Sequence, residues 1–212
     1  MNGKGFWIIV VALVVGILGA AVLFGKDAGD SVANAQGSQN YYGNAESPVT
    51  VTEFVDFQCE ACYAYYPGVK EVKETYKDRV QFRVRNFPIV TGHQFAMQAA
   101  RSAEAAALQG KYWEMHDKIF EGQKIWERTQ NPQNTFDQYA EEIGLNMEQY
   151  NTDKSSPEVS AAINKDLAVV KEIGGTGTPT FAINGEKVEN PGPSVEALSK
   201  MIDDALAEAE SN

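Results

Sequence analysis

The alternation of apolar and polar residues predicts two strands near the start of the folded part of the chain. Residues 49–57, VTVTEFVDF, are rich in β-branched and aromatic side chains, and residues 79–85 alternate apolar with polar positions. Between them, Tyr65, Val69 and Val72 recur at helical spacing. A strand, a helix and a second strand in close succession predict a βαβ unit with a right-handed crossover.

The period becomes helical over residues 94–173, which predicts a helical block inserted into this framework. Glycines break the block into segments, as expected where helices end. The predicted helices are residues 95–108, 112–120, 135–143 and 157–173.

The C-terminal part predicts a β-hairpin followed by a helix. Residues 180–188 contain two short apolar runs joined at Asn184-Gly185, a pair typical of two-residue hairpin turns. The last helix has one apolar face, formed by Leu198, Met201, Ile202, Ala205 and Leu206. The predicted fold class is therefore α/β, with a βαβ part, an inserted helical block over about residues 91–174, and a ββα part.

The first residues predict a membrane anchor. Residues 6–24 are a run of 19 residues without charge, and a helix of that length spans roughly 28 Å, close to the hydrocarbon thickness of a bilayer. The positive charge of Lys4 favours a cytoplasmic location for residues 1–5. The alternative is a cleaved signal peptide, because residues 33–35, Ala-Asn-Ala, have the form of a cleavage site.

A flexible stalk is expected to follow over residues 25–43, which are rich in Gly, Ser, Asn and Gln and lack an apolar period. Residues 44–212 then form one domain of ordinary size. With a single-pass anchor, this domain lies outside the cytoplasm, at the cell membrane.

The charge and the cysteine count exclude several classes of function. Lys and Arg number 18 against 29 Asp and Glu, so the net charge is -11, and such a surface repels nucleic acid. With two cysteines, neither a framework of several disulfides nor a four-cysteine zinc site is possible.

The two cysteines, Cys59 and Cys62, form a CxxC motif at the predicted start of a helix. The unpaired N–H groups and the positive dipole end of the helix stabilise the Cys59 thiolate, which makes this cysteine a nucleophile near neutral pH. Cys62 follows one turn later and can displace a partner from a mixed disulfide. The pattern is that of thiol–disulfide exchange.

Two other interpretations of the pair are open: a purely structural bridge, and a metal site completed by His93 and His116. A four-residue loop removes little chain entropy, which argues against the first. The histidines lie 23 positions apart, whereas a structural zinc site has about 3–5 residues between them. We expect both histidines to be structural, and we expect no metal and no cofactor.

Several motifs at once resemble the thioredoxin superfamily. They are the strand–CEAC–helix unit, Glu53 six residues before the motif, Pro67 five residues after it, and residues 177–180, Gly-Thr-Pro-Thr, ahead of the ββα end. The inserted helices and the runs RNFP, GKYWEMHD and GTPTF look more like the DsbA-type branch, the disulfide oxidoreductases of the bacterial cell envelope. The resemblance covers about residues 41–209.

The resemblance implies roles for three further residues. Pro179 matches the family's cis-proline, whose loop faces the disulfide and offers backbone groups to a substrate, and Thr178 before it tunes contact with the sulfurs. Glu53 matches a buried acid that exchanges a proton with Cys62. The alternatives are an ordinary trans proline in a turn and a solvated glutamate on the strand.

The residues between the cysteines, Glu60 and Ala61, depart from the resemblance. Oxidising members often carry a proline or a histidine there, and a histidine stabilises the neighbouring thiolate. The negative charge of Glu60 opposes the thiolate instead. We therefore expect these two positions to tune the redox properties of the pair.

The resemblance implies a membrane-tethered enzyme that forms disulfide bonds in exported proteins with the Cys59–Cys62 pair and is reoxidised by a membrane redox partner. This location suits the chemistry because disulfides persist outside the cytoplasm. The alternatives are a disulfide reductase or isomerase, and a thioredoxin-like binding module without turnover.

Overall fold

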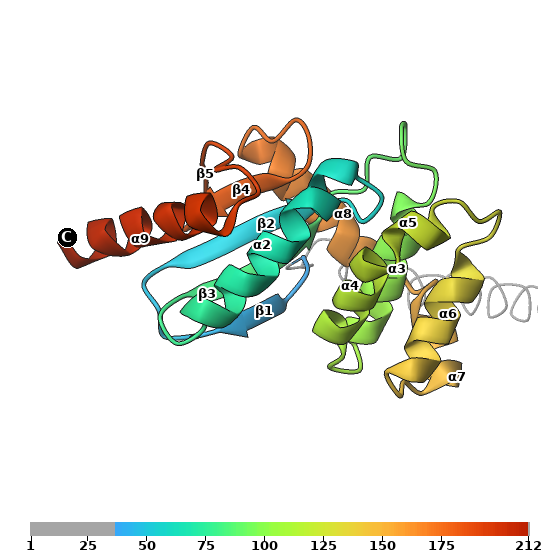
Figure 1. Cartoon of the computed structure of the whole chain (residues 1–212). Helices are drawn as coiled ribbons and strands as arrows, with labels where there is room; N and C mark the ends of the chain where they lie inside the picture. The colour runs from blue at the N-terminus through green and yellow to red at the C-terminus, as the bar shows by residue number, and fades with distance from the viewer. Residues whose placement is uncertain (1–36, 212) are drawn as a thin grey trace, which may run out of the picture. The chain divides into compact units, whose positions relative to one another are not determined.

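The computed structural model describes residues 37–211 and contains a sheet of five strands (Figure 1). They are β1 (Asn40–Gly43), β2 (Thr50–Val55), β3 (Gln81–Asn86), β4 (Thr180–Ile183) and β5 (Glu186–Lys187). Their order in the sheet is β1-β3-β2-β4-β5. Strands β2 and β3 are parallel and the other neighbours are antiparallel, so the sheet is mixed.

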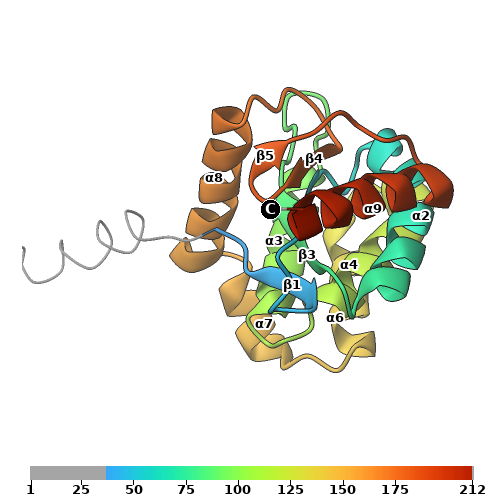
Figure 2. The ribbon, with the colours of Figure 1, turned by 90° about the vertical axis from the view of Figure 1, so that its left-hand side faces the viewer.

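Helices cover both faces of the sheet. Helices α2 (Glu60–Tyr76) and α9 (Val195–Ser211) pack on one face, and α8 (Pro157–Glu172) packs on the other, as Figure 2 shows from the edge of the sheet. Alternation along β2 produces this arrangement, because Val51 points to the α2 and α9 side while Phe54 points to α8.

The helical insertion forms a second layer of packing next to the sheet. Besides α8 it contains α3 (Ala96–Ala107), α4 (Tyr112–Glu121), α5 (Gln123–Trp126), α6 (Gln133–Glu142) and α7 (Met147–Asp153). Trp126, Phe136 and Tyr150 are fully buried at its centre. The same apolar cluster includes Phe57 and Cys62, so the CxxC motif lies where the sheet and the insertion meet.

The predicted βαβ unit, helical insertion and hairpin-helix end are all present. Asn184 and Gly185 have positive φ angles of 50° and 89°, as a two-residue hairpin turn requires. Helix α2 continues through Pro67 without interruption. The sequence pattern did not predict the short helices α5 and α7, which contain four and seven residues.

The stalk predicted over residues 25–43 is wrong at its C-terminal end. Strand β1 pairs antiparallel with β3, and Ser38 and Asn40 are buried. Their polar side chains resemble those of a linker, but hydrogen bonds within the domain satisfy them. The predicted anchor, residues 6–24, lies outside the described residues, and between residues 37 and 211 no helix has both the length and the apolar composition needed to cross a membrane.

A buried polar network holds this N-terminal strand. Asp166 of α8 accepts hydrogen bonds from the Ser38 backbone N–H (3.0 Å) and from the Arg85 guanidinium (2.9 Å). Glu104 of α3 accepts from the Asn40 side chain at 2.7 Å. The network therefore ties β1 and β3 to two helices of the insertion.

We expect Asp166→Ala to lower the free energy of unfolding by about 3–5 kcal/mol, because the Arg85 guanidinium would stay buried without its partner. Urea unfolding measures the change. The control is Asp204→Ala, which breaks an exposed ion pair with Lys200 and should change the stability by less than about 0.5 kcal/mol. Equal effects of the two substitutions would contradict a stabilising role for the buried network.

Candidate active site

Cys59 occupies the N-cap position of α2, directly after the turn that follows β2. Its backbone is extended, with φ -71° and ψ 125°, and no side chain caps the helix. The first N–H groups of α2 are therefore free to face the Cys59 sulfur. Both cysteines are in the thiol form; Cys59 is partly exposed, whereas Cys62 is buried.

The environment of Cys59 favours its thiolate. The hydrogen bond from the Cys62 thiol makes the largest contribution and lowers the pKa of Cys59 to about 5, although partial burial acts in the opposite direction. The Thr178 side chain and the backbone N–H groups of Cys62 and Ala61 lower the pKa further. At neutral pH, Cys59 is thus ionised, which is the state that a nucleophile of thiol–disulfide exchange requires.

The Thr178–Pro179 loop faces the same sulfur, and its peptide bond is cis. The Cys59 Sγ atom lies 3.5 Å from the Thr178 carbonyl oxygen. The buried Thr178 hydroxyl has no hydrogen-bond partner among the described residues while Cys59 is a thiol, so it is free to donate to the thiolate. A cleft of about 770 Å³ opens beside this loop and is lined by residues of the loop itself, such as Gly177, and by residues from Lys187 to Asn190.

Cys62 has the opposite environment. Burial raises the pKa of its thiol well above the ordinary value, and the neighbouring Cys59 and Glu53 charges raise it further. This thiol stays protonated at neutral pH, and it needs a base in order to attack a mixed disulfide.

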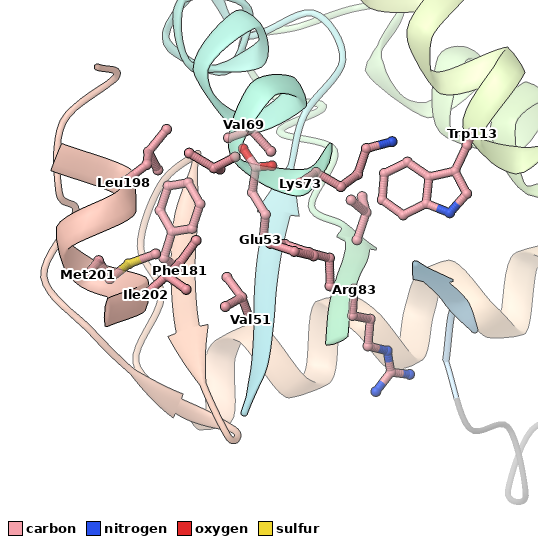
Figure 3. Close-up of a pocket in the computed structure, with 13 residues that line it drawn as sticks. Val51, Glu53, Val69, Lys73, Arg83, Trp113, Phe181, Leu198, Met201 and Ile202 are labelled. Carbon is pink, nitrogen blue, oxygen red and sulfur yellow. The ribbon is translucent and has the colours of Figure 1, made fainter. Parts of the chain in front are cut away.

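Glu53 lies in β2, beneath α2, and is 6% exposed. Burial raises its pKa to about 8, so its carboxyl group is protonated at neutral pH. Glu53 borders a small, partly enclosed cavity of about 20 Å³, which has room for about one water molecule. In Figure 3 the carboxyl group points toward α2, while the ammonium group of Lys73 points away from it, toward Trp113. The solvated-glutamate alternative is excluded.

The residues between the cysteines lie at the surface. The Glu60 side chain is 84% exposed and pairs with Lys124 of α5 at 3.1 Å. Its charge is therefore largely screened by solvent and by the lysine. Ala61 acts through its backbone N–H group, which faces the Cys59 sulfur.

The two histidines lie in separate environments. The His93 Nδ1 atom is 2.8 Å from the Asp56 carboxylate. His116 is buried among aromatic rings, and burial lowers its pKa. The rings are those of Phe57, Tyr66, Tyr112, Trp113 and Phe120. Across residues 37–211, no group of three or more His, Cys, Asp and Glu side chains is arranged to hold a metal ion.

Sequence reasoning missed the residues that hold the active-site turn. The buried Asp56 carboxylate accepts hydrogen bonds from the backbone N–H groups of Gln58 and Ile89, at 2.8 and 2.7 Å. The Gln58 side chain accepts one from the Phe95 N–H at 2.8 Å. An acidic residue at the end of an apolar strand was a usable signal for Asp56. No local pattern indicated Gln123 of α5, whose side chain also contacts the turn.

The raised pKa of Glu53 predicts a pH-dependent stability. Between about pH 5 and pH 8 the folded protein holds a proton that the unfolded chain has released, so the free energy of unfolding falls as pH rises. Relative to Glu53→Gln, the reduced wild type should lose about 1.4 kcal/mol per pH unit in this range. Urea unfolding of both reduced proteins at several pH values measures the difference. A constant difference would show that Glu53 titrates normally.

The hydrogen bond between the two sulfurs predicts how substitutions of Cys62 act. Cys62→Ala removes the donor and should raise the pKa of Cys59 clearly, whereas Cys62→Ser keeps an O–H donor and should raise it less. Titration of the ultraviolet absorbance of the thiolate measures both values. If both variants kept the wild-type pKa, the backbone N–H groups and Thr178 would account for the stabilisation without the Cys62 thiol.

Comparison with known proteins gives a consistent result for the folded unit. A family model described as thioredoxin matches residues 35–204. A thioredoxin-like oxidoreductase from Silicibacter pomeroyi DSS-3 is 29% identical, with a TM-score of 0.66, over 86% of this chain and 98% of that chain. BdbD from Bacillus subtilis is 21% identical, with a TM-score of 0.67, over 80% and 93% of the two chains. At that identity, the likeness to BdbD is one of fold alone.

Matches among curated proteins are to parts of much larger chains. The Na(+)/H(+) antiporter NhaA 3 of Salinispora tropica is 34% identical over 167 residues, which is 79% of this chain and 24% of the antiporter. The chain thus spans about a quarter of the length of the curated relatives it matches. The name of the antiporter describes that whole protein and assigns no transport activity to the matched part.

Proposed function

This chain belongs to the thioredoxin family and is a thiol–disulfide oxidoreductase, and we propose that it introduces disulfide bonds into exported proteins. The Cys59–Cys62 disulfide is transferred to a client that carries two thiols. The client is oxidised by two electrons, and the cysteine pair is reduced to the dithiol.

The observation that carries this proposal is the lowered pKa of Cys59. A pKa of about 5 means that the reduced protein gains free energy from an ionised sulfur, and the disulfide form has no such charge to stabilise. Stabilisation of the reduced form makes the disulfide a stronger oxidant. The exposed, screened carboxylate of Glu60 does not offset this effect.

The reaction begins when a client thiolate attacks the Cys59 sulfur, which is the exposed one of the two. The S–S bond to Cys62 breaks, and a mixed disulfide forms between Cys59 and the client. The second client thiolate then attacks the client sulfur that is bound to Cys59, which forms the client disulfide, and Cys59 leaves as a thiolate. A thiolate of low pKa is a good leaving group, so release of the oxidised client is favoured.

Glu53 supplies and recovers the proton for Cys62. When Cys62 leaves as a thiolate in its buried position, the protonated Glu53 carboxyl group is the acid placed near it. In the reverse direction, the Glu53 carboxylate accepts the proton of the Cys62 thiol as this thiol attacks. Its pKa of about 8 suits both steps near neutral pH.

The proposed location and partners follow from the sequence. An anchor at residues 6–24 would hold the domain at the cell membrane, outside the cytoplasm, where disulfides persist. There the dithiol form needs a membrane redox partner that accepts its two electrons. The acidic surface disfavours nucleic acid as a partner.

The redox potential of the full-length protein tests the direction of the reaction. We expect a value closer to about -120 mV, that of a strong oxidant, than to about -270 mV, that of a strong reductant, after equilibration with glutathione. The oxidised protein should also restore disulfides to a reduced, unfolded substrate protein. Cys59→Ser is the control and should lack this activity.

Two results would overturn the proposal. A potential near about -270 mV would assign the chain to the reductases. Full biological activity of Cys59→Ser would assign it to the binding modules, because turnover requires the nucleophilic sulfur.

A further inference from the structure

Gln123 is fully buried in α5 and contacts the active-site turn through its side-chain amide. The Nε2 atom donates hydrogen bonds to the carbonyl oxygens of Phe57 at 2.8 Å and Cys59 at 3.1 Å. These carbonyls belong to the turn that joins β2 to α2. A side chain of the helical insertion thus holds the backbone on both sides of Gln58.

The oxygen of the same side-chain amide lacks a hydrogen-bond donor among the described residues. The Gln123 Oε1 atom is buried and has no hydrogen-bond partner among residues 37–211. A buried acceptor without a partner costs about 1–3 kcal/mol, so this position does not serve stability alone. The cost is explained if the two donated bonds are needed for the reaction.

The bonded carbonyls control where the first N–H groups of α2 point. A peptide group is planar, so holding the Cys59 carbonyl fixes the plane that also contains the Glu60 N–H. The same Cys59 oxygen accepts the Tyr63 N–H at 3.0 Å, the bond that closes the first turn of the helix. The N–H groups of Ala61 and Cys62, which face the Cys59 sulfur, lie within this turn.

Helix α5 contacts its neighbours through the residues that follow Gln123. Trp126 is fully buried, and its indole N–H donates to the Ile119 carbonyl at 2.7 Å. Lys124 pairs with Glu60 in the first turn of α2 and lies 5.2 Å from the centre of the Tyr63 ring. These contacts of Trp126 and Lys124, which follow Gln123 in the chain, hold α5 against α4 and α2.

We propose that Gln123 is a positioning residue for thiol–disulfide exchange, whose side-chain amide holds the Phe57 and Cys59 carbonyls and so aims the N–H groups of α2 at the Cys59 sulfur. This inference rests on exchange at Cys59 and Cys62, the chemistry of the proposed function, and holds for either direction of electron flow. It gives the inserted helices a part in the chemistry of the pair.

The redox potential distinguishes a loss of positioning from a general loss of stability. The N–H groups stabilise a thiolate that exists only in the reduced protein. Loss of positioning therefore destabilises the reduced form more than the oxidised form, whereas loss of simple packing destabilises both equally. The difference appears as a shift of the redox potential.

The test compares Gln123→Met, which keeps the length of the side chain and removes both donors, with Ile163→Val, which removes one buried methyl group from α8 in a different apolar cluster. Both changes are made in the full-length protein. In Gln123→Met the pKa of Cys59 should rise by on the order of half a unit to one unit, equivalent to about one hydrogen bond. The potential should become less oxidising than that of the wild type. Ile163→Val should lower stability and leave both values unchanged.

An unchanged Cys59 pKa and potential in a folded Gln123→Met protein would overturn the inference. If that variant does not fold, Gln123→Leu replaces it, because leucine is uncharged, has a similar size and cannot donate to either carbonyl. It should raise the pKa of Cys59 as far as Gln123→Met, and an unchanged value would again overturn the inference. A wild-type potential in the range of reductases would refute the proposed direction without affecting this comparison.

Discussion

The hydrogen bonds that converge on the Cys59 sulfur are the interaction on which the rest of the site depends. Partial burial of this sulfur disfavours its thiolate, and the donors from Cys62, Thr178 and the start of α2 outweigh that effect. A donor that moved away would leave the burial uncompensated and raise the pKa. The geometry of the turn before α2 therefore determines the ionisation of Cys59, its quality as a leaving group and the redox potential of the pair.

The helical insertion fixes that turn from two directions. Asp56 and Gln58 accept hydrogen bonds from the chain that leads from β3 into the insertion. Gln123 of α5 donates to the carbonyl oxygens of Phe57 and Cys59. Four successive residues of the turn are thus held by side-chain or backbone bonds to the insertion or to the segment that leads into it, which explains why the CxxC motif lies at the boundary between the insertion and the sheet.

The sequence predicted the elements that local periodicity determines and missed the features that depend on partners far away in the chain. The strands, the insertion and the hairpin follow from alternation and turn chemistry. Strand β1 was interpreted as a stalk, since Ser38 and Asn40 are buried only because Glu104 and Asp166, more than 60 residues away, accept their hydrogen bonds. Glu60 likewise stands next to Cys59 in sequence, but in the structure its carboxylate meets Lys124 in solvent.

The ionisation of the cysteine pair and of Glu53 also depends on burial and on hydrogen bonds from residues outside the CxxC motif. A carboxylic acid is ordinarily stronger than a thiol by several pKa units, yet here Glu53 has a pKa of about 8 and Cys59 of about 5. Burial raises the pKa of Glu53, and several hydrogen-bond donors lower the pKa of Cys59, so the usual order of the two pKa values is reversed. Near neutral pH the site therefore holds an ionised thiolate together with a protonated carboxyl group, the combination that exchange through a buried second sulfur requires.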